Sequence, residues 1–347
     1  MSTEARAKNG ELLLYPDDIT PITNFYGQSI VSARQFDLPG LETFYGQALE
    51  IEEMIKTDKA SLAKFLEHQI IATLFYQSST RTRLMFEVAA KRLGAGVVTE
   101  TDVQFSSRSR GESLKHTIRV VSGMVDGVVL RDPKPGFATD VLPYAVSPLF
   151  NGGDGAREHP VQALKDYYTM IKEFGDLRGR RVTLLGDLKY GRTVHSLAYI
   201  LNLHGSEVML VAPNPLRAPR EMVEMLQGGC PVVKEFANFA EMEEAGEDPG
   251  DVTYVTRLQI EKVEADLDIN PDNKLSMMVE LRREYANCTI TPDWVVKYPG
   301  NRLMHPLPIG GGEIDPRLDF HQQSIYFRQS DNGVPTAAAI LKLCLVG

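Results

Sequence analysis

Short apolar runs alternate along the chain with longer stretches in which apolar side chains recur at helical spacing. The short runs predict buried strands, and the longer stretches predict amphipathic helices. Strands are expected over residues 69–76, 96–101, 127–130, 181–185, 207–211 and 252–256. Helices are expected over residues 41–56, 82–93, 113–124, 159–174, 193–203, 220–226 and 335–345. Because strands that alternate with helices pair in parallel and are covered on both faces, this order predicts an α/β protein with two doubly wound parallel sheets.

The length of the chain and the order of its elements point to two domains. A chain of 347 residues exceeds what one hydrophobic core usually serves. Residues 1–24 begin with a polar stretch that contains Pro16 and Pro21, and they predict an irregular N-terminal arm. The alternation restarts near Pro160, which divides the rest into residues 25–158 and 159–333. In such folds a ligand binds at the carboxyl ends of the strands, between the domains.

Composition narrows the possible functions. The chain has 46 acidic and 37 basic residues, and its net charge of −9 disfavours a general binder of nucleic acid or of anionic membranes. No stretch approaches the roughly 18 apolar residues of a membrane span, and the N-terminus lacks the apolar core of a signal peptide. The cysteines lie far apart and predict reduced thiols in a cytoplasmic protein rather than disulfides or a zinc site.

Residues 75–94, FYQSSTRTRLMFEVAAKRLG, form the most informative segment. A strand-like run ends in serines, and Ser79-Thr80-Arg81-Thr82-Arg83 then leads into a helix. Hydroxyl groups, unpaired N–H donors and the helix dipole favour an anion at such a junction. Arginine adds fork-shaped donors that match phosphate or carboxylate oxygens. An ordinary helix cap with surface arginines is the alternative, but the density of these groups favours a phosphate site at Ser79, Thr80, Arg81 and Thr82.

Three further polar clusters follow in the first half. Residues 105–112, FSSRSRGE, form either a solvated loop or a lid that brings Ser106 and Arg110 to an anion. Arg131 directly follows the predicted strand 127–130 and is expected to face the cleft. His159 and Gln162 lie three residues apart at a helix start, hence on one face. A histidine there is favoured in its neutral form and either caps the helix or donates to a carbonyl oxygen.

The second half carries three more. The strand, turn and helix of VTLLGDLKYGRTVHS lack the glycines of a dinucleotide site, because Leu188 replaces the second of them, and they lack a P-loop. What remains is Arg192 at a helix start, suited to a carboxylate. Arg257 and Gln259 lie two apart after a strand and point to one side if the chain stays extended. In LMHPLP, the prolines end a strand and leave the carbonyls around Leu307 to accept from a ligand amide.

Together these clusters supply arginines, a histidine, a glutamine and many hydroxyls, but no set of metal ligands and no Cys–His pair. We therefore expect no metal and no cofactor. A site of this composition stabilises negative charge and positions reactants without a covalent intermediate. It fits attack by an amine on an activated, phosphorylated carbonyl, with phosphate as the leaving group.

The ordered set STRTR, FSS…RGESL, VLRDP, NGGDG…HPVQAL, LLGDLKYGRTVHSL, TRLQ and HPLP resembles the aspartate/ornithine carbamoyltransferase family over most of the chain. GDLKYGRTVHS is closer to the aspartate enzymes. The resemblance implies a first domain for carbamoyl phosphate, with the helix over residues 334–347 packed back on it, and a second for aspartate or a related amine. It also implies a homotrimer with shared active sites. The product would be N-carbamoyl-L-aspartate, in de novo pyrimidine biosynthesis.

The resemblance also implies a role for each motif. Ser79, Thr80, Arg81 and Thr82 would hold the phosphate, together with Ser106 and Arg110 from a neighbouring subunit. Arg131 and His159 would polarise the carbamoyl carbonyl, so that Arg81, Thr82, Arg131 and His159 form the catalytic set. Gln162 and the carbonyls of Leu307 and Pro308 would bind the carbamoyl NH₂. Arg192 would bind the α-carboxylate of aspartate, and Arg257 with Gln259 would bind the β-carboxylate.

Three positions depart from the family pattern. Arg110 stands where a lysine is typical, Ile309 and three glycines follow HPLP where an arginine is typical, and the closing helix has Ala337 and its neighbours but no arginine. These departures leave two alternatives open. One is a paralogous carbamoyltransferase that acts on another amine. The other is a non-catalytic trimer subunit, against which His159 and the intact STRTR argue.

Overall fold

The computed structural model describes residues 19, 21–101, 107–266, 271–310 and 312–347. Most of the predicted N-terminal arm and the lid residue Ser106 lie outside the described residues. The chain forms two compact units. The first unit comprises the residues up to Tyr168 together with Asn332–Gly347, and the second unit comprises Thr169–Asp331.

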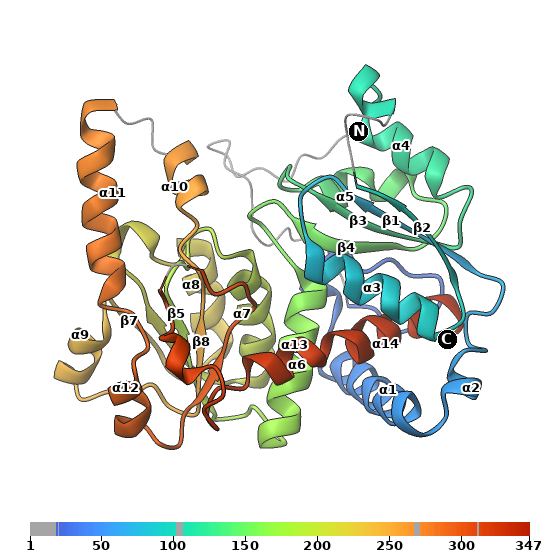
Figure 1. The fold of residues 1–347 in the computed structure, drawn as a ribbon. Coiled ribbons are helices and arrows are strands. Elements are labelled where there is room, and N and C mark those ends of the chain that lie inside the picture. Colours follow the sequence, from blue (N-terminus) through green and yellow to red (C-terminus); the bar gives the residue numbers. More distant parts are fainter. Residues whose placement is uncertain (1–18, 20, 102–106, 267–270, 311) are drawn as a thin grey trace. The chain divides into compact units, whose positions relative to one another are not determined.

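A four-stranded parallel sheet forms the centre of the first unit, in the order β2-β1-β3-β4 (Figure 1). Its strands are β1 (Ile70–Phe75), β2 (Gly96–Glu100), β3 (Gly127–Asp132) and β4 (Leu149–Asp154). Its helices are α1 (Leu38–Thr57), α2 (Lys59–Leu62), α3 (Thr80–Arg92), α4 (Leu114–Val121), α5 (Phe137–Val141) and α14 (Gly333–Leu345). Helices α4 and α5 cover one face of the sheet and α3 lies on the other, where α14 packs against α1 and α3.

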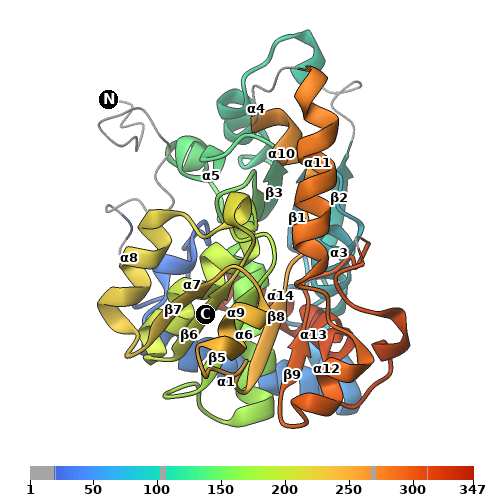
Figure 2. The same ribbon diagram turned by 90° about the vertical axis from the view of Figure 1, so that its left-hand side faces the viewer.

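A five-stranded parallel sheet forms the second unit, in the order β7-β6-β5-β8-β9, which Figure 2 shows side by side. Its strands are β5 (Arg181–Leu185), β6 (Glu207–Val211), β7 (Val233–Phe236), β8 (Val252–Val255) and β9 (Arg302–Met304). Its helices are α7 (Arg192–His204), α8 (Arg220–Gly229), α9 (Phe239–Glu244), α10 (Ile260–Asp266), α11 (Pro271–Ala286), α12 (Pro292–Lys297) and α13 (Tyr326–Asp331). Helix α6 (Pro160–Phe174) begins in the first unit and ends in the second.

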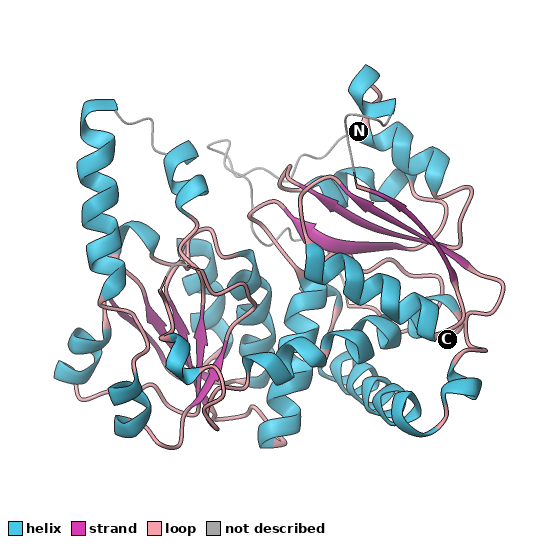
Figure 3. Cartoon of the chain, in the orientation of Figure 1, coloured by secondary structure: helices cyan, strands magenta, loops and turns pink. Residues whose placement is uncertain are grey.

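The predicted α/β fold with two parallel sheets is confirmed (Figure 3). Strands β4 and β7 are additions, because neither segment was predicted as a strand. In the fold the residues of β4 are buried, β4 pairs with β3, and the Asn151 amide donates to the carbonyl of Val31. In the part of the chain that the structure describes, no helix is long and apolar enough to cross a membrane.

Candidate active site

The STRTR segment begins helix α3. Ser79 is the N-cap residue, yet its side chain makes no capping hydrogen bond. In an ordinary cap, a serine oxygen would accept from an N–H of the first turn. The first-turn N–H groups of α3 are therefore not taken up by this hydroxyl, and Thr80, Arg81 and Thr82 lie in the same turn, after the carboxyl end of β1.

Arg131 lies inside β3 rather than after it, one residue before the strand ends. It is buried, and its Nη1 donates to the carbonyl of Gly152 on the neighbouring strand at 3.2 Å. The pairing of β3 with β4 shifts register between Leu130 and Asp132, so the regular ladder is interrupted where this guanidinium lies. The backbone thus places a buried cation at the carboxyl edge of the sheet.

The segment over residues 105–112 contains two arginines, and Arg108, which was not predicted to have a role, makes contacts within this unit. Arg108 donates to the buried carboxylate of Asp132 at 2.7 Å and lies over the ring of Tyr76, 4.4 Å from its centroid. Burial, followed by the nearby carboxylate of Glu100, raises the pKa of Tyr76 well above its ordinary value. Arg110 is exposed within this chain. Arg108 therefore anchors the described end of the lid to the end of β3.

His159 precedes α6 and lies beside the start of α3, although the two are far apart in the sequence. It is buried, and its Nε2 lies 3.4 Å from Thr82 Oγ1. The backbone N–H of Gln162 donates to Nδ1 at 3.4 Å. The same N–H also donates to the backbone carbonyl of His159, at 3.0 Å. The other ring nitrogen, Nε2, faces Thr82.

The side chain of Gln162 is held by a carboxylate that the sequence analysis did not identify. Its Nε2 donates to Asp166 Oδ1 at 2.7 Å, and both side chains are buried. Because the amide nitrogen is directed to Asp166, the amide oxygen is the end that remains to accept from another group. The four-residue spacing on one helix was the signal for this pair.

In the second unit, Asp187 joins the two motifs that were predicted to bind the acceptor. Its fully buried carboxylate accepts from the N–H of Tyr190 and from the N–H of Gln259, each at 3.0 Å. Burial raises the pKa of Asp187 to about 6, against the effect of these two donors. The loop after β5, which leads to Arg192, is thereby tied to the loop after β8, which carries Arg257 and Gln259.

Arg257 already engages one carboxylate within its own segment. Its Nη2 lies 2.5 Å from Glu261 Oε1, and its Nη1 lies 3.4 Å from Glu261 Oε2. This is the two-pronged geometry in which a guanidinium binds a carboxylate. Arg192 is the first residue of α7 and is partly exposed, as is Gln259.

The HPLP segment follows β9 and is held by a buried pair. His305 Nδ1 accepts from the N–H of Leu307 at 2.7 Å, and His305 Nε2 lies 3.4 Å from Glu313 Oε1. Leu307 has a φ of 60°, which is uncommon for a branched residue and orients the peptide groups next to Pro308. Ile309, where the family pattern has an arginine, packs against the hydrophobic core of this unit.

Each unit therefore gathers its own set of predicted residues at the carboxyl ends of its strands. The first unit holds Ser79, Thr80, Arg81, Thr82, Arg131, His159 and Gln162. The second unit holds Arg192, Arg257, Gln259, Leu307 and Pro308. Among the described residues, no group of histidine, cysteine and carboxylate side chains has the arrangement of a metal site.

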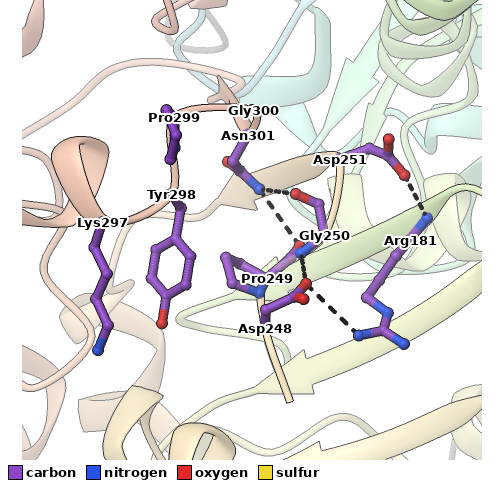
Figure 4. Close-up of a pocket in the computed structure, with 10 residues that line it drawn as sticks. All are labelled: Arg181, Asp248, Pro249, Gly250, Asp251, Lys297, Tyr298, Pro299, Gly300 and Asn301. Atoms are coloured by element: carbon purple, nitrogen blue, oxygen red, sulfur yellow. Dashed lines mark hydrogen bonds and ion pairs between the residues drawn. The ribbon is translucent and has the colours of Figure 1, made fainter. Parts of the chain in front are cut away.

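A cavity of about 610 Å³ in the second unit lies elsewhere, at the amino ends of β5, β8 and β9 (Figure 4). It is lined by Arg181, Asp248, Pro249, Gly250, Asp251, Lys297, Tyr298, Pro299, Gly300 and Asn301. Its arginine, Arg181, is paired with Glu207 and Glu247, each at 3.0 Å. Ligands of open parallel sheets bind at the opposite, carboxyl edge, and the charges here are already paired. This cavity is therefore not the candidate active site.

Two family models match consecutive parts of the chain. The carbamoyl-P binding domain of aspartate/ornithine carbamoyltransferase matches residues 28–172, and the Asp/Orn binding domain matches residues 178–344. The chain belongs to the aspartate/ornithine carbamoyltransferase family. The family resemblance that the ordered motifs carry is thus confirmed.

Relatives within this family cover nearly the whole chain. The aspartate carbamoyltransferase catalytic subunit of Methanocaldococcus jannaschii is 42% identical over 299 residues, which is 85% of this chain and 90% of that protein. The catalytic subunit of Methanococcoides burtonii is 38% identical over 323 residues, 93% of this chain and 98% of that protein.

Solved structures from the same family share the fold. The M. jannaschii catalytic subunit superposes with a TM-score of 0.78 at 39% identity, over 91% of this chain and 97% of that one. The Trypanosoma cruzi aspartate transcarbamoylase in complex with carbamoyl phosphate and aspartate gives a TM-score of 0.83 at 31% identity, over 95% of this chain and 100% of that one.

Proposed function

We propose that this chain transfers the carbamoyl group of carbamoyl phosphate to the amino group of L-aspartate, giving N-carbamoyl-L-aspartate and phosphate for pyrimidine biosynthesis. The observation that carries the proposal is the junction made by Asp187, which ties Arg192 and the Arg257–Gln259 pair to adjacent strand ends. Two arginines and an amide on joined loops suit an acceptor with two carboxylates. The T. cruzi relative, solved with carbamoyl phosphate and aspartate, supports the same pair of substrates.

In this proposal the first unit, which includes the predicted domain over residues 25–158 and the helix over residues 334–347, binds carbamoyl phosphate. Ser79, Thr80, Arg81 and Thr82 hold its phosphate at the start of α3. Arg131 and His159 donate to the carbamoyl oxygen, and the position of His159 Nε2 beside Thr82 at the start of α3 supports this role. Gln162, with its oxygen left available by Asp166, accepts from the carbamoyl NH₂ together with the carbonyls of Leu307 and Pro308.

The second unit, which makes up most of the predicted domain over residues 159–333, binds the acceptor. Arg192 takes the α-carboxylate of aspartate, and Arg257 with Gln259 takes the β-carboxylate. The neutral amine attacks the carbamoyl carbon, and negative charge develops on the oxygen beside Arg131 and His159. The intermediate collapses by breaking the bond to phosphate, which leaves with the proton that the amine gives up. The residues act by positioning and by charge stabilisation, without a cofactor.

A paralogous enzyme that carbamoylates another amine is the second candidate. Two positions favour it: Ile309, where the family pattern has an arginine, packs partly buried against the core, and Ala337 stands where the closing helix lacks an arginine. Both differences lie near segments that we assign to substrate binding. Shared motifs indicate the class of reaction more reliably than the identity of the substrate.

Phosphate release from carbamoyl phosphate, measured with a panel of amines, tests the proposal. We expect turnover with L-aspartate and none with L-ornithine. Arg257→Ala should raise the KM for aspartate by about tenfold or more while the affinity for carbamoyl phosphate is kept, because a charged hydrogen-bond partner is lost only at the acceptor. Turnover with a different amine alone would establish the second candidate. Equal loss of both affinities would remove Arg257 from the acceptor site.

The assembly that we propose is a cytoplasmic homotrimer with shared active sites, in which Ser106 and Arg110 serve the neighbouring subunit. The exposed position of Arg110 supports this arrangement. Apolar side chains left on the surface of the first unit, Val98, Val120 and Met124, suit a subunit contact. The three cysteines are buried free thiols, which suits a reducing compartment.

A further inference from the structure

Lys165 is a buried lysine that lies among three helices of the first unit. It is only 7% exposed. It follows Gln162 by three residues on α6, so the two side chains share a face of that helix. A Cβ at Gly333, the first residue of α14, would lie 2.8 Å from Met85 Sδ and 3.5 Å from Lys165 Cδ. The stem of Lys165 therefore packs where α6, α3 and the start of α14 meet.

Two charged groups, one of each sign, act on this ammonium. Arg81 in the first turn of α3 is close enough to repel it, and Asp166 on α6 attracts it. Asp166 also accepts from the Gln162 amide, and the first turn of α14 carries no charged side chain. Burial is the main reason that the pKa of Lys165 is lowered to about 8; Asp166 acts to raise this pKa, and Arg81 lowers it further. An anion beside Arg81 would stabilise both cations at once.

Lys165 lies close to the place where the closing helix lacks the arginine of the family pattern. Ala337, where the closing helix lacks an arginine, follows Gly333 by four residues and so lies on the same face of α14. A long side chain at residue 337 would extend toward the N-terminus of its helix, over Gly333. That is the place where the stem of Lys165 packs.

We propose that Lys165 is a further residue of the carbamoyl-phosphate site, supplying a buried cation for the phosphate beside the exposed Arg81 and replacing the arginine that the closing helix lacks. This inference rests on the proposed function. Lysine is a compact point charge that can lose its proton when no anion is bound, whereas arginine cannot. In the ligand-free protein the buried ammonium lowers the free energy of unfolding, and bound phosphate would offset this cost by pairing with the ammonium.

Binding of inorganic phosphate and of carbamoyl phosphate to the full chain tests this, by calorimetry and by thermal unfolding. We expect Lys165→Met to weaken both ligands by about 10–100-fold and to abolish most of the rise in Tm that they cause. The Tm of the ligand-free variant should stay the same or rise, because a buried charge is removed. Lys165→Arg should keep most of the affinity. Lys91→Met, which removes an exposed charge from α3, is the matched control and should change neither quantity.

A repair variant adds a second readout. Ala337→Arg, combined with Lys165→Met, should restore much of the lost phosphate affinity, and Lys165→Gln provides an alternative background if the methionine variant does not fold. The inference would be overturned if Lys165→Met binds phosphate as tightly as the wild type does, whether or not its ligand-free Tm is lower. The proposed function would still stand in that case, provided that the wild type turns over its substrates. A wild-type protein that fails to bind carbamoyl phosphate would overturn both.

Discussion

At the scale of single residues, several polar side chains assigned to a substrate contact a second polar group. The N–H of Gln162 lies 3.4 Å from His159 Nδ1, Asp166 accepts from the amide of Gln162, and Glu261 pairs with the guanidinium of Arg257. A charged hydrogen bond is stronger and more directional than a neutral one. These partners therefore restrict the donors and acceptors to one orientation before any substrate binds.

The stability of the ligand-free protein should depend on pH through Lys165. Its pKa is lowered to about 8 in the fold, mainly by burial, and is about 10.4 in an unfolded chain. Between these values the unfolded state binds more protons, so stability rises with pH across this window. Below it the full cost is present, on the order of 3 kcal/mol.

We therefore expect Lys165→Met to unfold at higher urea than the wild type near neutral pH, and the difference to disappear above the unfolded-state pKa. Urea titrations of the two proteins at a series of pH values measure this difference directly. Asp166 and Arg81, the charged neighbours of Lys165, are the same in the wild type and in Lys165→Met. The difference between the two curves therefore reports the lysine alone. A variant that is less stable than the wild type at neutral pH would contradict the cost of the buried charge.

At the scale of elements, the sheet brings the acceptor motifs together. Strands β5 and β8 are direct neighbours, with Leu185 opposite Val255, so the loops that follow them start side by side. The approach is tight, because a Cβ at Gly186 would lie 2.7 Å from the carbonyl oxygen of Thr256 and Gly186 has a φ of +107°. Only glycine fits there, which explains this part of the GDLKYGR motif. Asp187 then closes the junction with two hydrogen bonds.

Asp187→Asn should separate these two hydrogen bonds. The amide oxygen can still accept from Tyr190, but the amide nitrogen would face the N–H of Gln259, so that two donors meet. We expect the KM for aspartate to rise about tenfold or more and the free energy of unfolding to fall by about 1–3 kcal/mol, as for an unsatisfied buried donor. Affinity for carbamoyl phosphate should stay unchanged. Steady-state kinetics, calorimetry and urea unfolding check the three values, and a parallel loss of both affinities would contradict the assignment.

At the scale of the whole molecule, the chain is acidic while its candidate site is rich in cations. The net charge is −9, yet the strand ends of the first unit carry Arg81 and Arg131, and those of the second unit carry Arg192 and Arg257. The chain leaves the first unit at Tyr168 and returns to it at Asn332, so the first unit is built from two separate stretches of chain. A site shared between subunits would also depend on a second copy of the chain.

Mixing two inactive variants should reveal such sharing. If Arg110 serves the neighbouring subunit, refolding Arg81→Ala with Arg110→Ala in equal amounts creates some intact sites. Each intact site takes Arg81 from an Arg110→Ala subunit and Arg110 from an adjacent Arg81→Ala subunit. Random trimers then recover about a quarter of the wild-type activity. Light scattering measures whether the mixture forms trimers. A mixture of Arg81→Ala with Thr82→Ala, both in the proposed phosphate site, is the control that should stay inactive. Mixed trimers without activity would show that each site uses its own Arg110.

The sequence by itself determined the α/β class, the two parallel sheets, the family and the order of the polar motifs. Those features follow from local hydrophobic period and from residue types at strand ends, which are read without knowing what lies across the fold. The terminal helix and the start of α3 were predicted to within a few residues for this reason.

Only the tertiary structure decided which groups orient and complete the site. Strand β4 forms where no strand was predicted, Arg108 rather than Arg110 binds Asp132, and Ile309 packs against a core. Asp187 and Lys165 were hidden for the same physical reason. Burial and hydrogen-bond partners come from residues far apart in the sequence, and local pattern carries no record of them.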